Sequence, residues 1–290
     1  MRIRRWTFGI GAWLLCATAG PGMAQQDGSQ AAQPLSESLL VLRQTTRSEG
    51  GMTGGSSRSG GAMVERVLER RGDGLVIEYD NPKKPRRPMW QLPVRVLDRP
   101  GRATALLDEA AVETRIEAYL VENPRLRPYC GQTIFTWTAI SIDCEPEAAL
   151  EMVEPYDLRP GPLAEGMPYA EADATGPVPL EALPAEDGNR LLSARLTIDP
   201  DTLRAEDLEM LVQVARIVGR GPRTIEAAAE QESATRYAGE RTVTFTIADD
   251  GTVLRRSSVT VVDIERADAR GTERREMERT VERQDMPEDA

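Results

Sequence analysis

The chain has 290 residues, of which 40% are hydrophobic and 4% aromatic, and its 47 acidic and 36 basic residues give a formal net charge of −11 at pH 7. This length is sufficient to bury one large hydrophobic core or two small ones. The chain contains no histidine, which excludes histidine-dependent catalytic triads, imidazole general bases and histidine-ligated zinc sites. The acidic balance argues against nucleic-acid binding, because that depends on cationic contacts to phosphates.

Residues 1–24 have the pattern of a secretory signal peptide. Arg2, Arg4 and Arg5 form a cationic start, a short apolar run follows, and a small-residue cleavage site ends at Ala24. The apolar run is too short to cross about 30 Å of hydrocarbon. We predict export to the periplasm, by the general or the twin-arginine route, with cleavage after Ala24. Loss of three arginines lowers the formal net charge to −14, and the mature chain is expected to be soluble, with no membrane-spanning segment.

Residues 25–36 are predicted to form a disordered leader, because they have few apolar side chains to bury. Residues 37–154 are predicted to form an N-terminal α+β lobe. Gly50–Gly61 contains six glycines in twelve residues, and this composition predicts a flexible loop or wide turn. Alternating and helical patterns around it predict three strands and two helices: strands Leu39–Thr46, Met63–Arg70 and Leu75–Tyr79, and helices Thr104–Val121 and Pro146–Val153.

Residues 81–88 (NPKKPRRP) form a concentrated positive patch. The prolines favour an extended, exposed conformation. The patch is interpreted as a solvated linker, and the alternative is a contact with anionic lipid or acidic glycan.

Cys130 and Cys144 remain after cleavage, and an oxidising compartment favours a disulfide between them. The intervening run Thr133–Ile142 is rich in β-branched and aromatic residues and predicts a strand. An unbroken strand extends by about 3.3 Å per residue, whereas the Cα atoms of a disulfide lie within roughly 7 Å of each other. The sequence therefore predicts a disulfide and a strand that folds back near Thr136–Thr138.

Residues 155–185 carry seven prolines and little periodicity, which predicts an irregular, acidic crossing. Residues 186–284 are predicted to form a C-terminal α+β lobe that ends in an antiparallel meander, and 285–290 a free tail. The elements expected in this lobe are a strand over Leu191–Ile198, a helix over Leu203–Val218 that Thr202 or Asp201 caps, and a hairpin of Thr242–Ile247 with Val253–Ile264.

The last predicted element, Thr272–Arg283, alternates Glu and Arg. This pattern predicts an exposed edge strand, because charges on an edge prevent pairing with other chains. A terminal helix is the competing interpretation, since both residues are good helix formers.

The predicted fold class is α+β, because hairpin turns rather than regular βαβ crossovers join the strands. We expect helices packed on one face of either one strongly curved antiparallel sheet or two small sheets. The curved arrangement is similar in architecture to the half-barrels of envelope proteins that carry lipids or lipoproteins.

The leading functional hypothesis is a non-enzymatic periplasmic binding or envelope-interaction protein, whose partner is a lipid, another apolar ligand or another envelope protein. An apolar pocket between sheet and helix is the expected ligand site, and Phe135, Trp137 and Leu211 are its candidate residues. No catalytic, metal or cofactor site is predicted: residues 171–176 imitate the start of a calcium loop, but Ala182 stands where a bidentate glutamate is required.

Two alternative functions remain open. Carboxylates can hydrolyse glycans without histidine, so a carboxylate-dependent hydrolase of envelope glycan is the first. The second is a scaffold partner that uses the exposed edge at 272–283 for strand addition.

Overall fold

The computed structural model describes residues 34–50, 55–83, 89–99, 103–135, 139–159, 161–267 and 271–286, without the side chains of 133–135 and 139–141. The predicted signal peptide and most of the leader lie outside the described residues. So do Trp137 and most of the basic patch, from residue 84 to 88.

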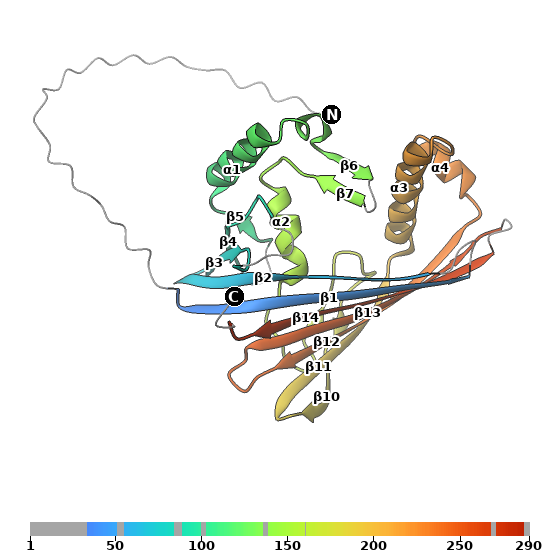
Figure 1. Ribbon diagram of the computed structural model, residues 1–290. Helices are drawn as coiled ribbons and strands as arrows, with labels where there is room; N and C mark the ends of the chain where they lie inside the picture. The colour runs from blue at the N-terminus through green and yellow to red at the C-terminus, as the bar shows by residue number, and fades with distance from the viewer. Residues whose placement is uncertain are drawn as a thin grey trace, which may run out of the picture. The chain divides into compact units, whose positions relative to one another are not determined.

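One ten-stranded antiparallel sheet contains most of the strands, in the order β10-β11-β12-β13-β14-β1-β2-β3-β4-β5 (Figure 1). Pairing of β1 with β14 joins the strands from both halves of the chain, so the sheet is single, as in the curved alternative. The strands are β1 (Ser36–Gly50), β2 (Gly55–Arg71), β3 (Gly74–Asp80), β4 (Val94–Asp98), β5 (Ala105–Leu106), β10 (Glu181–Glu186), β11 (Asn189–Ile198), β12 (Arg236–Ile247), β13 (Val253–Glu265) and β14 (Thr272–Gln284).

Two small hairpins, four helices and two 3-10 turns complete the described structure. The hairpins are β6 (Gln132–Phe135) with β7 (Ala139–Ile142) and β8 (Pro168–Tyr169) with β9 (Val178–Pro179). The helices and turns are α1 (Glu109–Glu122), η1 (Arg127–Tyr129), α2 (Ala148–Val153), η2 (Glu154–Tyr156), α3 (Pro200–Val218) and α4 (Ile225–Gln231). Helix α4 and the short strands in the 155–185 crossing were not predicted from the sequence.

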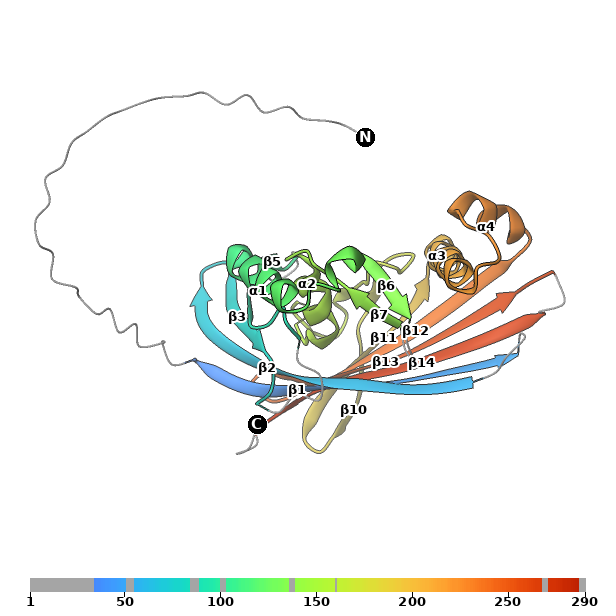
Figure 2. The same cartoon turned by 45° about the horizontal axis from the view of Figure 1, so that its top comes forward.

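The sheet curves beneath α1, α2 and α3 without closing, so β10 and β5 are its edges (Figure 2). We call the face toward these helices the inner face. Side chains of α1 and α2 share a hydrophobic core with β1–β4, and Leu203 of α3 packs with Ile198, Tyr237 and Ile264 of the C-terminal strands. Because α4 packs on α3 rather than on the sheet, the prediction of helices on one face is confirmed in part.

Apolar residues on the inner face are concentrated away from the middle of the sheet. Residues at one end form the core with α1 and α2, and β11 and β12 form a second core with residues of the 155–185 crossing. Between these cores the inner face carries polar side chains, including those of Gln44, Ser258, Thr260, Arg275 and Arg279, as the strand register shows. The central strands are therefore held by cross-strand pairing and polar contacts more than by an apolar layer.

The predicted edge position of Thr272–Arg283 is wrong. The segment is a strand, but β14 lies between β13 and β1 and pairs with both along its length. Its charges are matched across the neighbouring strands, as in the ion pairs Arg43–Glu282 and Arg274–Asp263. The scaffold hypothesis that used this strand as a free edge fails for the same reason.

The predicted loop at Gly50–Gly61 is also wrong over Gly55–Gly61, which belong to β2 and pair with β1. A methyl group at Gly61 would collide with the Tyr156 hydroxyl, and one at Gly60 with the Leu42 carbonyl oxygen. The two glycines therefore permit close approach of the Tyr156 hydroxyl and of the β1 backbone to β2.

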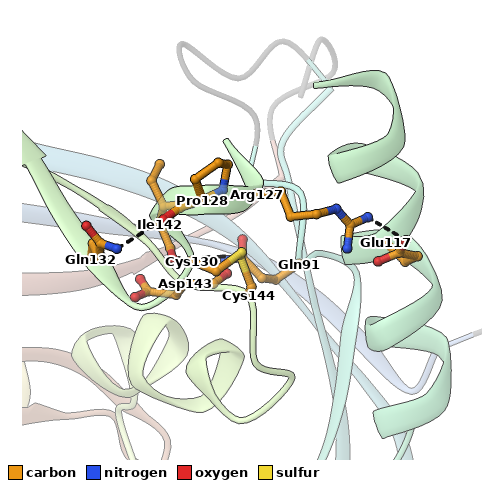
Figure 3. The surroundings of a disulfide bond; sticks show 9 residues. All are labelled: Gln91, Glu117, Arg127, Pro128, Cys130, Gln132, Ile142, Asp143 and Cys144. Carbon is orange, nitrogen blue, oxygen red and sulfur yellow. Dashed lines mark hydrogen bonds and ion pairs between the residues drawn. A yellow bond between two sulfur atoms is a disulfide. The ribbon is translucent and has the colours of Figure 1, made fainter. Parts of the chain in front are cut away.

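The disulfide prediction is confirmed: Cys130 and Cys144 are bonded, with their Cα atoms 5.4 Å apart (Figure 3). Strands β6 and β7 pair antiparallel, so the run between the cysteines folds back as predicted. Arg127 in the preceding η1 turn forms an ion pair of 2.6 Å with Glu117 on α1, which ties the disulfide hairpin to that helix.

The predicted helix over Leu203–Val218 is confirmed as α3, with Gly219 left-handed at its C-terminus. Its N-cap is Asp199, whose carboxylate accepts the backbone N–H of Asp201, and not Thr202 or Asp201.

The contact between Gly61 and Tyr156 gives a test of the close approach in β2. Gly61→Ala should lower the free energy of unfolding by about 1–3 kcal/mol, because it overpacks this contact. The penalty should shrink in a Tyr156→Phe background, where the next ring atom lies 3.6 Å from the added methyl. Urea denaturation of the four proteins measures the coupling. Gly55→Ala, with nothing within 4 Å, is the control, and an equal loss for both alanines would contradict the assignment.

Candidate functional site

A cavity with a volume of about 1230 Å³ lies at one end of the sheet. We call it the end cavity. It lies among the β2–β3 turn, the β12–β13 turn, residues 158, 159, 161 and 162, and the adjoining ends of β1 and β14. Antiparallel pairing brings the start of β1 and the end of β14 to the same end of the sheet, as Figure 1 shows.

Part of the wall of the end cavity is apolar. Val67, Leu75, Leu158, Val253 and Leu254 line it. Leu158 is fully buried in the core of α1 and α2, whereas Leu75 and Val253 are half-buried at its margin. The cavity thus borders the core and offers apolar surface to a ligand.

Another part of the wall is an arginine pair held by one buried carboxylate. Glu65, on the inner face of β2, is 1% exposed, and its Oε1 lies 2.7 Å from Arg159 Nη2 and 2.7 Å from Arg283 Nη1. Arg283 Nη1 also donates to Ser38 Oγ at 3.1 Å. Both arginines line the end cavity. We call Glu65, Arg159 and Arg283 the arginine pair cluster.

The arginine pair cluster has hydrogen-bonding groups without partners. Arg159 Nη1, Arg283 Nε and Glu65 Oε2 are buried and unpartnered in the described structure. Burial by itself would raise the pKa of Glu65, but Arg159 and Arg283 outweigh it and lower the pKa. The carboxylate is therefore held ionised, and the guanidinium groups keep unused donor capacity.

Asp98 borders both the end cavity and this cluster. Its Oδ2 lies 4.0 Å from Arg159 Nε, beyond hydrogen-bonding distance. Burial, followed by the neighbouring Asp157 carboxylate, raises the pKa of Asp98. Its charged form is disfavoured relative to that of an exposed aspartate.

Several charged groups nearer the rim have partners of their own. Glu37 pairs with Arg66 at 2.7 Å, and Asp73 pairs with Arg99 at 2.9 Å. Arg71 pairs with Glu69 at 3.0 Å. These exposed pairs contribute little to stability, and they leave the arginine pair cluster as the buried charged part of the wall.

A second buried charge cluster attaches α3 to the sheet. Asp207 of α3 is 2% exposed and accepts from Arg266, Arg275 and the Tyr237 hydroxyl at 3.0–3.1 Å. Glu273 of β14 bonds the same two arginines. This cluster adds a polar attachment of α3 to the apolar packing of Leu203 on the sheet.

A smaller cavity of about 250 Å³ lies over the middle of the inner face and is lined by Arg241, Arg256 and Arg279. Glu171 forms ion pairs with the first two, and Arg279 donates to Gln44 Oε1 at 3.2 Å. Burial, then Arg256 and Arg241, lower the pKa of Arg279. This cavity is too small and too polar for an apolar ligand, so the end cavity is the better candidate site.

Of the three residues proposed from sequence for an apolar pocket, Leu211 alone has a described side chain. Leu211 lies on α3 and packs with Leu208, Val212 and Ala228 at the contact with α4. The backbone of Phe135 lies in β6, but its side chain is outside the described residues, as is the whole of Trp137. A pocket that uses the two aromatic residues stays a prediction.

Sequence reasoning missed Glu65, Arg159 and Arg283, although one local signal was present. Glu65 interrupts the buried alternation of Met63 and Val67, and a carboxylate on the buried face of a strand requires a partner. The partners lie 94 and 218 residues further along the chain, so local pattern does not reveal them.

Among the described residues, no group of histidine, cysteine, aspartate or glutamate side chains is arranged to hold a metal ion. No described helix has the length and apolar character required to cross a membrane.

Comparisons with known proteins do not assign the chain to a family. No family model and no curated protein matches the chain. A solved structure of lipovitellin ("Lipid-protein interactions in lipovitellin") is similar at 11% sequence identity, with a TM-score of 0.40, over 89% of this chain and 26% of that chain. The chain thus spans about a quarter of the length of that protein chain.

Removal of the shared carboxylate should destabilise the end of the sheet. Glu65→Gln leaves two buried arginines without a charged acceptor, and loss of one partner from a buried ion pair costs about 3–5 kcal/mol. Urea denaturation measures the change. Glu37→Gln, which breaks an exposed pair near the same rim, should cost below about 1 kcal/mol; equal losses would contradict a buried role for Glu65.

The α3 attachment should weaken in acid. Hydrogen bonds from Arg275, and then its charge, lower the pKa of Glu273 to about 2 from an ordinary value of 4.5. A lowered pKa contributes stability above the unfolded value, and this contribution is lost as the pH falls from 4.5 toward 2. The difference in unfolding free energy between wild type and Glu273→Gln should therefore be largest near neutrality. It should decrease as the pH falls through this interval. A constant difference would contradict the assigned ion pairs.

Proposed function

We propose that the protein is an exported, periplasmic binding protein that takes up an apolar or amphiphilic ligand in the end cavity. The observation that carries this proposal is the cavity itself: its volume of about 1230 Å³ and its partly apolar wall. Pockets of about 300–1000 Å³ already bury most of a drug-sized molecule. The end cavity therefore offers room for a ligand with a long hydrocarbon segment.

Two features support the exported part of the proposal. The first 24 residues have the pattern of a signal peptide. The disulfide between Cys130 and Cys144 is of a kind that persists in oxidising compartments.

The position of the cavity also supports a binding role. Its wall is made by turns and strand ends at the margin of a rigid sheet, so a ligand can enter without separating the central strands. Leu254 lines the cavity and is half-buried, which makes it a suitable position for obstruction.

Native mass spectrometry of the protein secreted with its own leader tests the proposal. We expect a polypeptide that begins at Gln25, together with a non-covalent mass in the range of a lipid. Leu254→Trp should reduce the occupancy several-fold, because the indole fills the cavity. Leu183→Trp on the edge strand β10, where the leucine is 40% exposed, is the matched control and should leave occupancy unchanged.

Two results would overturn parts of the proposal. Retention of Met1 in the cytosol would overturn export. A ligand-free mass for the wild type, together with failure to bind added dodecanol and dodecanoate, would overturn the binding function.

A further inference from the structure

We propose that the ligand of the end cavity is an amphiphile with an oxyanion head group, carboxylate or phosphate, which Arg159 and Arg283 bind. This inference rests on the proposed function, and it assigns the polar end of the ligand to the arginine pair cluster. The hydrocarbon part of the ligand would lie against the apolar wall around Leu75 and Leu254.

The first argument is the donor capacity of the two arginines. A guanidinium group has five N–H donors. Arg283 uses Nη1 for Glu65 and Ser38, and Arg159 uses Nη2 for Glu65. Arg159 Nη1 and Arg283 Nε are buried without a partner, and buried donors without acceptors are costly. An oxyanion in the cavity would supply the missing acceptors once a small rotation of either guanidinium group turns these donors toward it.

The second argument is access. The side chains of Arg159 and Arg283 are 19% and 17% exposed, and both line the cavity. Glu65, at 1% exposure, lies behind them. The groups that a ligand would meet are therefore the arginines and not the carboxylate that holds them.

The surrounding carboxylates leave these donors unsatisfied. Glu65 offers the same oxygen, Oε1, to both arginines. Asp157 accepts the backbone N–H of Arg159 at 2.8 Å, and Asp98 is 4.0 Å from Arg159 Nε.

The head group follows from the chemistry of arginine. The planar guanidinium matches two oxygens of a carboxylate or phosphate, and the resulting bonds are stronger than those to a neutral hydroxyl. The apolar wall next to the arginines then requires that the anion carry a hydrocarbon chain.

Isothermal titration calorimetry of the mature, disulfide-bonded protein near neutral pH tests the inference with four probes of one chain length: dodecanoate, dodecyl phosphate, dodecanol and dodecylammonium. We expect the two anions to bind about tenfold or more tightly than dodecanol, as hydrogen bonds to charged groups predict. Dodecylammonium should bind most weakly. The two anions distinguish a fatty-acid type of ligand from a phosphate type.

Variants assign the effect to residues. Arg283→Gln should lower the affinity for the anions about tenfold and leave dodecanol binding nearly unchanged. The matched control is Arg195→Gln, which removes the same charge from an exposed position on β11 outside the cavity lining and should change affinity less than about twofold.

A variant that increases affinity is a useful test, because misfolding would not produce such an increase. Asp98→Asn removes a negative charge beside Arg159 without removing bulk, and it should strengthen binding of both anions several-fold while leaving dodecanol unchanged. Thermal unfolding of each variant verifies that it is folded.

The outcomes separate this inference from the proposed function. Failure of all four probes to bind overturns the proposed function. Equal affinity for dodecanoate, dodecyl phosphate and dodecanol overturns the oxyanion head group and leaves the binding function in place. Equal losses in Arg283→Gln and Arg195→Gln overturn the assignment to the arginine pair.

Discussion

The pairing of β1 with β14 is the constraint on which the rest of the structure depends. It runs from Leu39 opposite Gln284 to Gly50 opposite Glu273, and it joins strands that come from the two ends of the described chain. Without it there would be two separate sheets with four edges. With it, Arg283 reaches Glu65 across 218 residues of sequence, and the end cavity acquires walls from both halves of the chain. Such non-local pairing is entropically costly to form and is typical of slow folding.

The long pairing also explains why polar central strands are stable. A strand whose inner face carries Gln44 and Arg279 gains little from burial, so its stability comes from continuous backbone hydrogen bonds on both sides and from matched side chains. The hydrogen bonds from Arg279 to Gln44 and from Arg241 to Thr260 illustrate this matching. Apolar packing is left to the regions covered by helices or by the 155–185 crossing.

The sequence was informative where one local rule decides the structure. The hairpin of β12 with β13 and the helix α3 follow from local patterns, and the paired β6 and β7 strands follow from the geometry of a disulfide. Local rules failed where contacts with distant parts of the chain decide the structure. Alternating Glu and Arg in β14 fits an edge or a centre equally well.

Two further failures have the same cause. Composition indicates a loop at Gly55–Gly61, but Gly61 pairs with Leu42 in the sheet, and its lack of a side chain leaves room for the Tyr156 hydroxyl. The candidate site was hidden for a similar reason. Glu65 is conspicuous in its strand, yet Arg159 and Arg283 have no local signature, and only the fold brings them to it.

The two buried charge clusters resemble each other chemically but differ in what surrounds them. The cluster around Asp207 and Arg266 lies between α3 and the sheet, where it attaches the helix. The arginine pair cluster already adjoins an apolar core, and apolar residues of similar volume would stabilise that end at least as well. Stability alone therefore gives no reason to place two arginines and a carboxylate there. A cavity of about 1230 Å³ beside them gives one, because buried guanidinium groups with free donors are of use where an anion can reach them.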